Sequence, residues 1–210
     1  MKRSLTVAAC FLCLSLGLAL FGEQGYLAMK ARLAERLIAR SYSAHLQDGL
    51  AHPPWSWADT HPIARLTAPR LGVERTLLAG ASGASLAFGP GHIDGTARPN
   101  SRGNCCVAGH RDTSFRFLGD LRIGDTLWLE TRGARLRYSV TERSVRSKWD
   151  DHVLRSTASP RLTLITCWPL DAWVPGPERL VVIAEPLTAE DLVSAKGGQA
   201  PWWSDPSFSL

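Results

Sequence analysis

The amino-terminal part of the chain is dominated by one long apolar stretch. Residues 5–22 carry no charged side chain and follow Lys2 and Arg3. Eighteen residues of helix rise about 27 Å, which is close to the thickness of the hydrocarbon core of a bilayer. The pattern therefore predicts an amino-terminal transmembrane helix, and we assign residues 1–22 to a membrane anchor.

A cleaved signal peptide is the alternative for this stretch, because several small residues lie between positions 15 and 19. The apolar run is long for the hydrophobic region of a signal peptide, and no small-x-small cleavage site precedes Glu23. An uncleaved anchor is therefore favoured. Charge alone leaves its orientation open, because basic residues lie on both sides of the run.

Residues 25–47 have the hydrophobic period of a helix. Apolar side chains recur there at spacings of three and four, at Tyr26, Met29, Leu33 and Leu37. This stripe predicts a helix whose apolar face packs on the folded part of the protein. Pro53 and Pro54 end the helical pattern. We assign residues 23–60 to a helical stalk and linker.

Beyond residue 60 the pattern changes to that of β-strands. Short apolar segments alternate with glycine and proline turns, and helical periodicity is nearly absent. The segments expected to form strands are 63–67, 74–78, 105–108, 126–130, 136–142, 162–166 and 180–184. Many short strands at this spacing predict an all-β barrel or sandwich. We place this domain at residues 61–188, followed by a carboxy-terminal tail at 189–210.

Composition narrows the classes of function. A length of 210 residues is sufficient for one domain with a sizeable core. The formal charge of +5 is modest and spread along the chain, so a nucleic-acid-binding surface is not expected. Five cysteines, an odd number, define no disulfide framework. In a strand, Cys105 and Cys106 alternate, one toward the core and one outward.

Three reactive side chains lie at the ends of neighbouring predicted strands. His110 follows the strand at 105–108, and Cys167 follows the strand at 162–166. Arg179 directly precedes the strand at 180–184. A thiol attacks a carbonyl, an imidazole transfers protons, and a guanidinium stabilises the developing oxyanion. The three residues together predict a site for thiol-based acyl transfer.

Each of these residues has an alternative nearby. His92 lies in a glycine-rich stretch and His152 in a charged one, so we expect the first to form a structural hydrogen bond and the second to be solvated. Arg111 is the alternative to Arg179. In an extended segment, however, its side chain points away from that of its neighbour His110.

No cofactor or metal ion is expected. Cys105, Cys106, His110 and Asp112 match no standard zinc spacing, and we expect Asp112 to cap a turn. The glycine-rich stretch at 89–91 lacks the lysine and the strand-to-helix context of a phosphate-binding loop.

The motifs around the three reactive residues resemble those of sortases, which are membrane-anchored cysteine transpeptidases. The family pattern is a glycine-histidine pair, a threonine-leucine-any-threonine-cysteine strand and an arginine about a dozen residues later. Here these are Gly109-His110, the segment Thr163-Leu164-Ile165-Thr166-Cys167, and Arg179. The glycine-rich approach at 88–104 is also similar, and the resemblance spans residues 60–186. The segment 55–60 and the pair Cys105-Cys106 resemble the class GN sortases of Gram-negative, often marine, bacteria.

The resemblance implies a closed barrel of about eight strands with short helices. It implies a single-pass anchor in the cytoplasmic membrane, with the catalytic domain on the periplasmic side. His110, Cys167 and Arg179 are the implied catalytic residues. The implied substrate is a secreted protein with a carboxy-terminal sorting signal of the LPxTG kind, which forms a thioester with the cysteine. An amine acceptor, or water, then releases it, and the subgroup resemblance suggests a dedicated partner protein.

Two other functions are compatible with the same residues. One is a thiol transpeptidase that acts on peptidoglycan, but Cys167 follows Ile165-Thr166 and not the Ser-x-Gly of those enzymes. The other is a membrane-tethered binding module with an inactive sortase-like barrel. The sequence gives this second function little support, because all three catalytic positions are occupied by the expected residue types.

Overall fold

The computed structural model describes residues 25–26, 29–174 and 176–187. The predicted anchor at 1–22 and the predicted tail at 189–210 lie outside these residues. Among the residues described, no helix combines the length and the apolar composition needed to span a membrane. The chain divides into two compact units, Met1–Leu37 and Ile38–Leu210, and the second contains the whole barrel.

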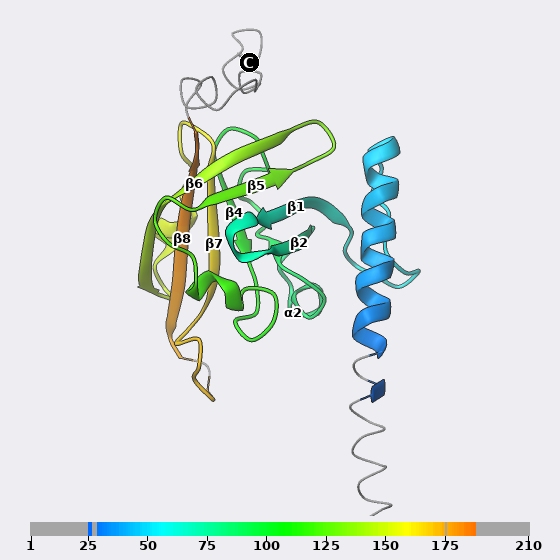
Figure 1. Ribbon diagram of the computed structural model, residues 1–210, viewed down its shortest axis with the longest axis horizontal. Helices are drawn as coiled ribbons and strands as arrows, with labels where there is room; N and C mark the ends of the chain where they lie inside the picture. Colours follow the sequence, from blue (N-terminus) through cyan, green and yellow to red (C-terminus); the bar gives the residue numbers. More distant parts are fainter. Residues whose placement is uncertain (1–24, 27–28, 175, 188–210) are drawn as a thin grey trace, which may run out of the picture. The chain divides into compact units, whose positions relative to one another are not determined.

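Eight strands close into a mixed β-barrel (Figure 1). In chain order they are β1 (Pro62–Ala68), β2 (Val73–Leu78), β3 (Gly91–His92), β4 (Asn104–Ala108), β5 (Thr126–Glu130), β6 (Arg135–Ser147), β7 (Arg161–Trp168) and β8 (Glu178–Pro186). Around the barrel they follow the order β1-β2-β3-β4-β7-β8-β6-β5, and β1 pairs with β5 to close it. The pairs β2–β3 and β4–β7 are parallel, and the other pairs are antiparallel. The predicted closed barrel of about eight strands is confirmed.

Short helices occupy several connections. They are η1 (Pro69–Leu71), α2 (Gly83–Leu86), η2 (Arg116–Gly119) and η3 (Asp151–Leu154). All seven predicted strands are present. The strand predicted at 136–142 continues to Ser147, because β8 pairs with β6 as far as Ser147, beyond the end of the β5 pairing at Ser139. The strand that the pattern missed, β3, has only two residues and too little sequence to show a period.

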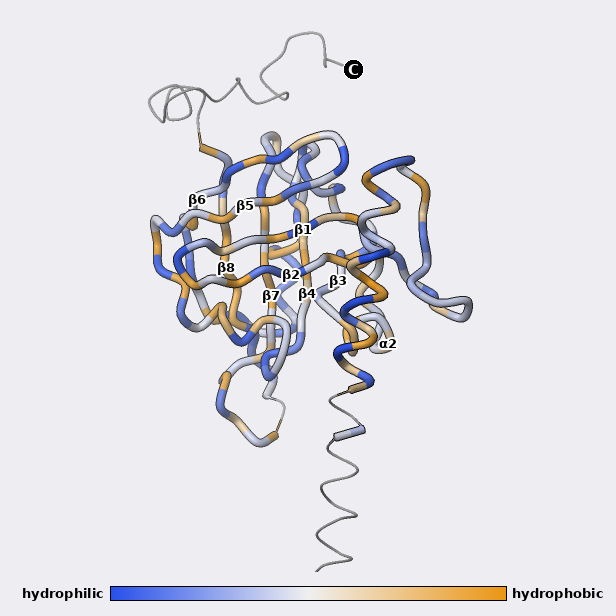
Figure 2. Tube along the Cα trace, turned by 45° about the vertical axis from the view of Figure 1, so that its right-hand side comes forward, coloured by the Kyte–Doolittle hydropathy of each residue, from blue (hydrophilic) through white to orange (hydrophobic). Residues whose placement is uncertain are grey.

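The core fills the inside of the barrel, and the strands alternate between the core and the outer face. Figure 2 shows the hydrophobic residues that run along β7 and β8. On β7, Leu162 and Leu164 belong to the core cluster, and on β8 so do Leu180, Val182 and Ala184. Residues one position away from these face outward, so β7 and β8 also present an outer surface.

The two cysteines of β4 alternate as expected, and the outward-facing one is covered by another part of the chain. Cys105 belongs to the core cluster, while Cys106 faces the other way and is still fully buried. The connection from β6 to β7 lies over it. The amide of Asn104 donates to the carbonyls of Val153 (2.9 Å) and Arg155 (3.1 Å), and the Sγ of Cys106 is 3.8 Å from the Val153 carbonyl.

The helix at 29–48 contributes to the barrel unit through its second half. Ile38 and Tyr42 are buried, and the Tyr42 hydroxyl donates to the Glu130 carbonyl at 3.0 Å. The Arg65 guanidinium lies 4.9 Å from the centre of the Tyr42 ring, and burial raises the pKa of Tyr42 to about 12. The predicted apolar stripe does not pack as expected, because Leu33 is 56% exposed and the buried positions Ile38 and Tyr42 lie outside that stripe.

Replacing Tyr42 tests this attachment. Y42A removes a fully buried aromatic ring together with its hydrogen bond, and we expect it to lower the free energy of unfolding by about 3 kcal/mol or more. L33A, an exposed site on the same helix, is the control and should change it by about 0.5 kcal/mol or less. Urea denaturation of both variants measures the difference. Equal effects of the two variants would show that the ring does not attach the helix.

Candidate active site

The pairing of β4 with β7 determines where His110 lies. The two strands run parallel, and their last paired residues are Ala108 and Ile165. The pairing continues one residue further, because the backbone N–H of Gly109 donates to the Ile165 carbonyl at 3.1 Å. Extending this register by two residues from the last pair places His110 beside Cys167.

Arg179 approaches Cys167 from the opposite side. The two are direct register partners in the antiparallel pair β7–β8. Residues opposite each other in such a pair have Cα atoms about 4.5–5.5 Å apart and side chains on the same face. Cys167 and Arg179 are therefore paired across β7 and β8, and the extended β4 register places His110 on the other side of Cys167. We call these three residues the row, and Figure 1 shows β4, β7 and β8 side by side.

This row lies on the outer face of the barrel. Leu164 and Leu180 point into the core, so Cys167 and Arg179, an odd number of positions away, point outward. Both are partly exposed, and His110 is exposed. The structure thus pairs Cys167 with Arg179 and directs His110, two residues past the end of β4, to the same end of the sheet. A substrate can reach this part of the surface. Their catalytic roles stay predictions.

Glycine is needed immediately before the histidine. A Cβ at Gly109 would lie 2.6 Å from the ring of Phe115, which is fully buried. The turn that follows closes with a hydrogen bond of 2.9 Å from the Phe115 N–H to the His110 carbonyl. The glycine lets this ring pack directly against the end of β4, which fixes the point at which His110 leaves the sheet.

Thr166 ties the two motifs together. Its side chain is buried, and its Oγ1 donates to the Gly109 carbonyl at 2.7 Å. With the bond from Gly109 to Ile165, the residue before the histidine is held through both its N–H and its carbonyl. Thr166, which precedes Cys167, therefore helps to align the end of β7 with the end of β4.

The two candidate arginines differ in their hydrogen bonds. The Arg111 side chain is 8% exposed, and it donates from Nη1 to the Pro169 carbonyl at 2.9 Å and from Nη2 to the Ala172 carbonyl. Arg179 is partly exposed and, among the described residues, donates only from Nη1, to the carbonyls of Gly176 (3.1 Å) and Glu178 (2.8 Å). Arg179 therefore keeps donors for a substrate oxygen, whereas the donors of Arg111 are used by the protein.

The connection from β7 to β8 begins directly after Cys167 and presents apolar side chains. Trp173 is fully exposed and Val174 is 74% exposed, while Leu170 packs against the core. The connection is also tied to the end of β6 by a bond of 2.7 Å from the Lys148 N–H to the Pro177 carbonyl. The β7–β8 connection therefore lies next to the row, where the predicted wall of a peptide groove would be.

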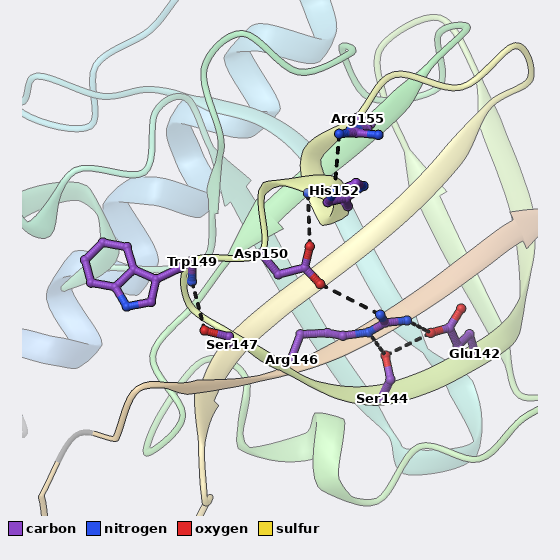
Figure 3. Close-up of polar contacts among 8 residues, drawn as sticks. All are labelled: Glu142, Ser144, Arg146, Ser147, Trp149, Asp150, His152 and Arg155. Atoms are coloured by element: carbon purple, nitrogen blue, oxygen red, sulfur yellow. Dashed lines mark hydrogen bonds and ion pairs between the residues drawn. The ribbon is translucent and has the colours of Figure 1, made fainter.

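A fourth residue, which is charged, continues the row on β6, and the sequence patterns did not reveal it. Arg146 is the register partner of Arg179. Figure 3 shows it between Glu142 (3.0 Å), the Ser144 hydroxyl (3.0 Å) and Asp150 (3.8 Å). Hydrogen bonds from Arg146 and Ser144 hold the pKa of the Glu142 carboxyl below its usual range. The carboxylates offset the charge of Arg146, which reduces its repulsion of Arg179.

The other residues weighed from sequence lie outside the row. His92 is buried, and its Nε2 lies 2.9 Å from the Ala97 carbonyl, so its structural role is confirmed. His152 is exposed beside Arg155 (Figure 3). Asp112 is exposed and pairs with Arg111 at 3.4 Å.

The described residues contain one group with the spacing of metal ligands, formed by Asp150, Asp151 and His152. Asp151 and His152 are exposed, and no buried ligand supports them, so the group alone does not define a metal site. Among the free cysteines of the described residues, Cys167 is the one that reaches the surface. Burial raises the pKa of Cys106 to about 11 and that of Cys105 further still, so both are protonated at neutral pH.

Comparisons with known proteins agree with this arrangement. The model of the sortase domain family matches residues 66–187, more than half of the chain. Sortase D of Bacillus subtilis is 27% identical over 124 residues, which make up 59% of this chain and 63% of that protein. The match thus spans less than two thirds of this curated relative.

Solved structures show the same fold. A Clostridium perfringens sortase D5 transpeptidase superposes with a TM-score of 0.62 at 22% identity, covering 74% of this chain and 99% of that one. The catalytic domain of SrtD from B. anthracis superposes with a TM-score of 0.52 at 33% identity, covering 60% and 87%. With the family match, these findings establish that the chain belongs to the sortase family of cysteine transpeptidases.

Removing the Thr166 hydroxyl tests the link between the two strand ends. T166V keeps the shape of the side chain but leaves the Gly109 carbonyl without this donor, so we expect the free energy of unfolding to fall by about 1–3 kcal/mol. T166S keeps the hydroxyl and serves as the matched control, with a smaller loss. Thermal or urea unfolding compares the two. A T166V protein as stable as T166S would show that this bond does not hold the strand ends together.

Proposed function

We propose that this protein is a sortase-type transpeptidase that cleaves a carboxy-terminal, LPxTG-like sorting signal of a secreted protein and transfers the cleaved protein to an amine. The row of His110, Cys167 and Arg179 on the outer face of the barrel carries this proposal. It combines a nucleophile, a proton-transfer group and a cation within reach of one amide bond. Membership of the sortase family supports the class of reaction.

The first half of the reaction breaks the amide bond after the threonine of the signal. The thiolate of Cys167 attacks the threonine carbonyl carbon, and the oxygen becomes an oxyanion. The N–H groups of Arg179 that have no acceptor among the described residues are suited to stabilise this charge. As the C–N bond breaks, the protonated imidazole of His110 gives its proton to the leaving amine. The threonine remains bound to Cys167 as a thioester.

The second half transfers the threonine. The amine of an acceptor attacks the thioester carbonyl, and neutral His110 takes up the proton that the amine loses. The C–S bond then breaks, which restores the thiolate of Cys167 and the imidazolium of His110. If water attacks in place of the amine, the same steps produce hydrolysis.

The cellular setting is part of the proposal. The apolar stretch at 1–22 would anchor the chain in the cytoplasmic membrane, and residues 23–60 would connect it to a catalytic domain at 61–188 on the periplasmic side. The tail would occupy 189–210. The segment 55–60 and the pair Cys105-Cys106 support a place in the class GN subgroup, and with it a dedicated protein substrate.

Trapping the acyl-enzyme tests the proposed function. Incubation with a peptide that contains LPxTG should add the mass of the acyl fragment to the tryptic peptide of Cys167, and hydroxylamine should release it. C167A should lose the adduct and reduce cleavage about a thousandfold or more, as expected for loss of a nucleophile. C106A, which removes a buried thiol, should keep both.

An adduct that persists in C167A would contradict the assignment of the nucleophile. Neither adduct nor cleavage with the intact protein, across a panel of sorting peptides and amines, would favour the inactive binding module.

A further inference from the structure

Arg111 is a buried charged residue that the proposed mechanism does not use. Its side chain is 8% exposed, although it follows the exposed His110 directly. An ionised guanidinium is costly to bury unless its N–H groups are satisfied. Here the carbonyls of Pro169 and Ala172 accept from Nη1 and Nη2, and the carboxylate of Asp112 lies 3.4 Å from Nε. The cost of burial is therefore offset by the neighbouring Asp112 and by two carbonyls of one segment.

That segment is the connection from β7 to β8, which joins Cys167 to Arg179. Arg111 holds its first part, because the Pro169 carbonyl also accepts from the Ala172 N–H at 3.4 Å and the guanidinium closes the same turn. Leu170, between these two residues, packs against the core and lies beside Gly119, where a Cβ would be 2.5 Å from its Cδ1. Polar and apolar contacts thus fix residues 169–172 to the body of the barrel.

The end of the same connection holds Arg179. Its Nη1 donates to the Gly176 carbonyl at 3.1 Å. Gly176 itself packs closely on the start of the connection, because a Cβ there would lie 3.0 Å from the Trp168 carbonyl. The same Cβ would lie 3.9 Å from the Cδ of Pro169, whose carbonyl accepts from Arg111. A shift of Pro169 therefore disturbs the packing of Gly176, and with it the carbonyl that orients the guanidinium.

We infer that Arg111 is a positioning residue: it fixes the β7–β8 connection so that Gly176 orients the guanidinium of Arg179 toward Cys167. Arg111 touches no reacting atom and acts through Arg179. Lysine cannot replace it, because an ammonium lacks the planar fork that reaches two carbonyls in fixed directions. The catalytic consequence rests on the proposed function, whereas the placement of Arg179 is measurable without turnover.

The charge beside the Cys167 thiol reports the position of Arg179. A nearby cation favours alkylation by the anion iodoacetate over the neutral iodoacetamide, and mass spectrometry of the Cys167 peptide from the full-length chain gives both rates. Loss of a unit charge at about 4 Å from the reacting anion corresponds to about a threefold to tenfold change in this ratio in water. R179Q should lower the preference for iodoacetate by that factor. R111K should lower the preference nearly as much, although lysine keeps the positive charge at position 111, because Arg179 is then misplaced.

The double variant decides whether Arg111 acts through Arg179. R111K combined with R179Q should have the same ratio as R179Q alone, because no guanidinium is left to misplace. R116K, the same substitution at an exposed arginine in the following turn, should keep the wild-type ratio. L170A loosens the same connection without changing a charge and should also lower the ratio, which provides a test if R111K folds poorly.

A wild-type ratio in folded R111K, or in L170A if R111K does not fold, would overturn the inference. An equal further loss in the double variant would also overturn it, because Arg111 would then act on the thiol directly. In the cleavage assay, R111K should reduce kcat/KM in the wild-type background and not in R179Q. If the intact protein cleaves no sorting peptide while the ratios behave as expected, the proposed function fails and the placement of Arg179 by Arg111 stands.

Discussion

The parallel pairing of β4 with β7 is the constraint on which the site depends. Histidine and cysteine are separated by 57 positions in the chain, and only the register of these two strands brings their ends to the same level. Gly109 maintains that register at the end of the pair, since its N–H and its carbonyl are both bonded to β7. A shift of one residue would turn Cys167 or His110 to the other face of the sheet.

The closed barrel makes this register hard to change. Inward-facing leucines on β7 and β8 are buried in a common core, so sliding either strand would expose them. The outer face then receives the opposite set of side chains, and the reactive row belongs to that set. The alternation of side chains between the two faces of each strand therefore determines both the packing of the core and the arrangement of the site. The charged residues around Arg146 extend the row to β6 and keep its charge balanced.

The strands and the three residues of the row could be predicted from the sequence, because both follow from short local patterns. The strands have a clear two-residue period, and the Gly-His, Thr-Leu-x-Thr-Cys and Arg motifs lie at strand ends, where one register determines several positions. Contacts between connections have no such period. The burial of Cys106 depends on the β6–β7 connection that covers it, and the role of Arg111 depends on carbonyls 58 and 61 residues away. The short strand β3 and the partner of Arg179 on β6 likewise follow from the closure of the barrel.

The most direct measurement of the central claim is whether positions 110 and 167 are in contact. Neighbouring strands lie about 4.8 Å apart, within the range of Cα separations that a disulfide bridges, about 4.4–6.8 Å. Mild oxidation of H110C should therefore link position 110 to Cys167, as identified by peptide mapping, whereas T113C, an exposed site in the following turn, should form no such link. If H110C forms no internal disulfide while Cys167 still reacts with small thiol reagents, the two strand ends do not meet and the site described above does not exist.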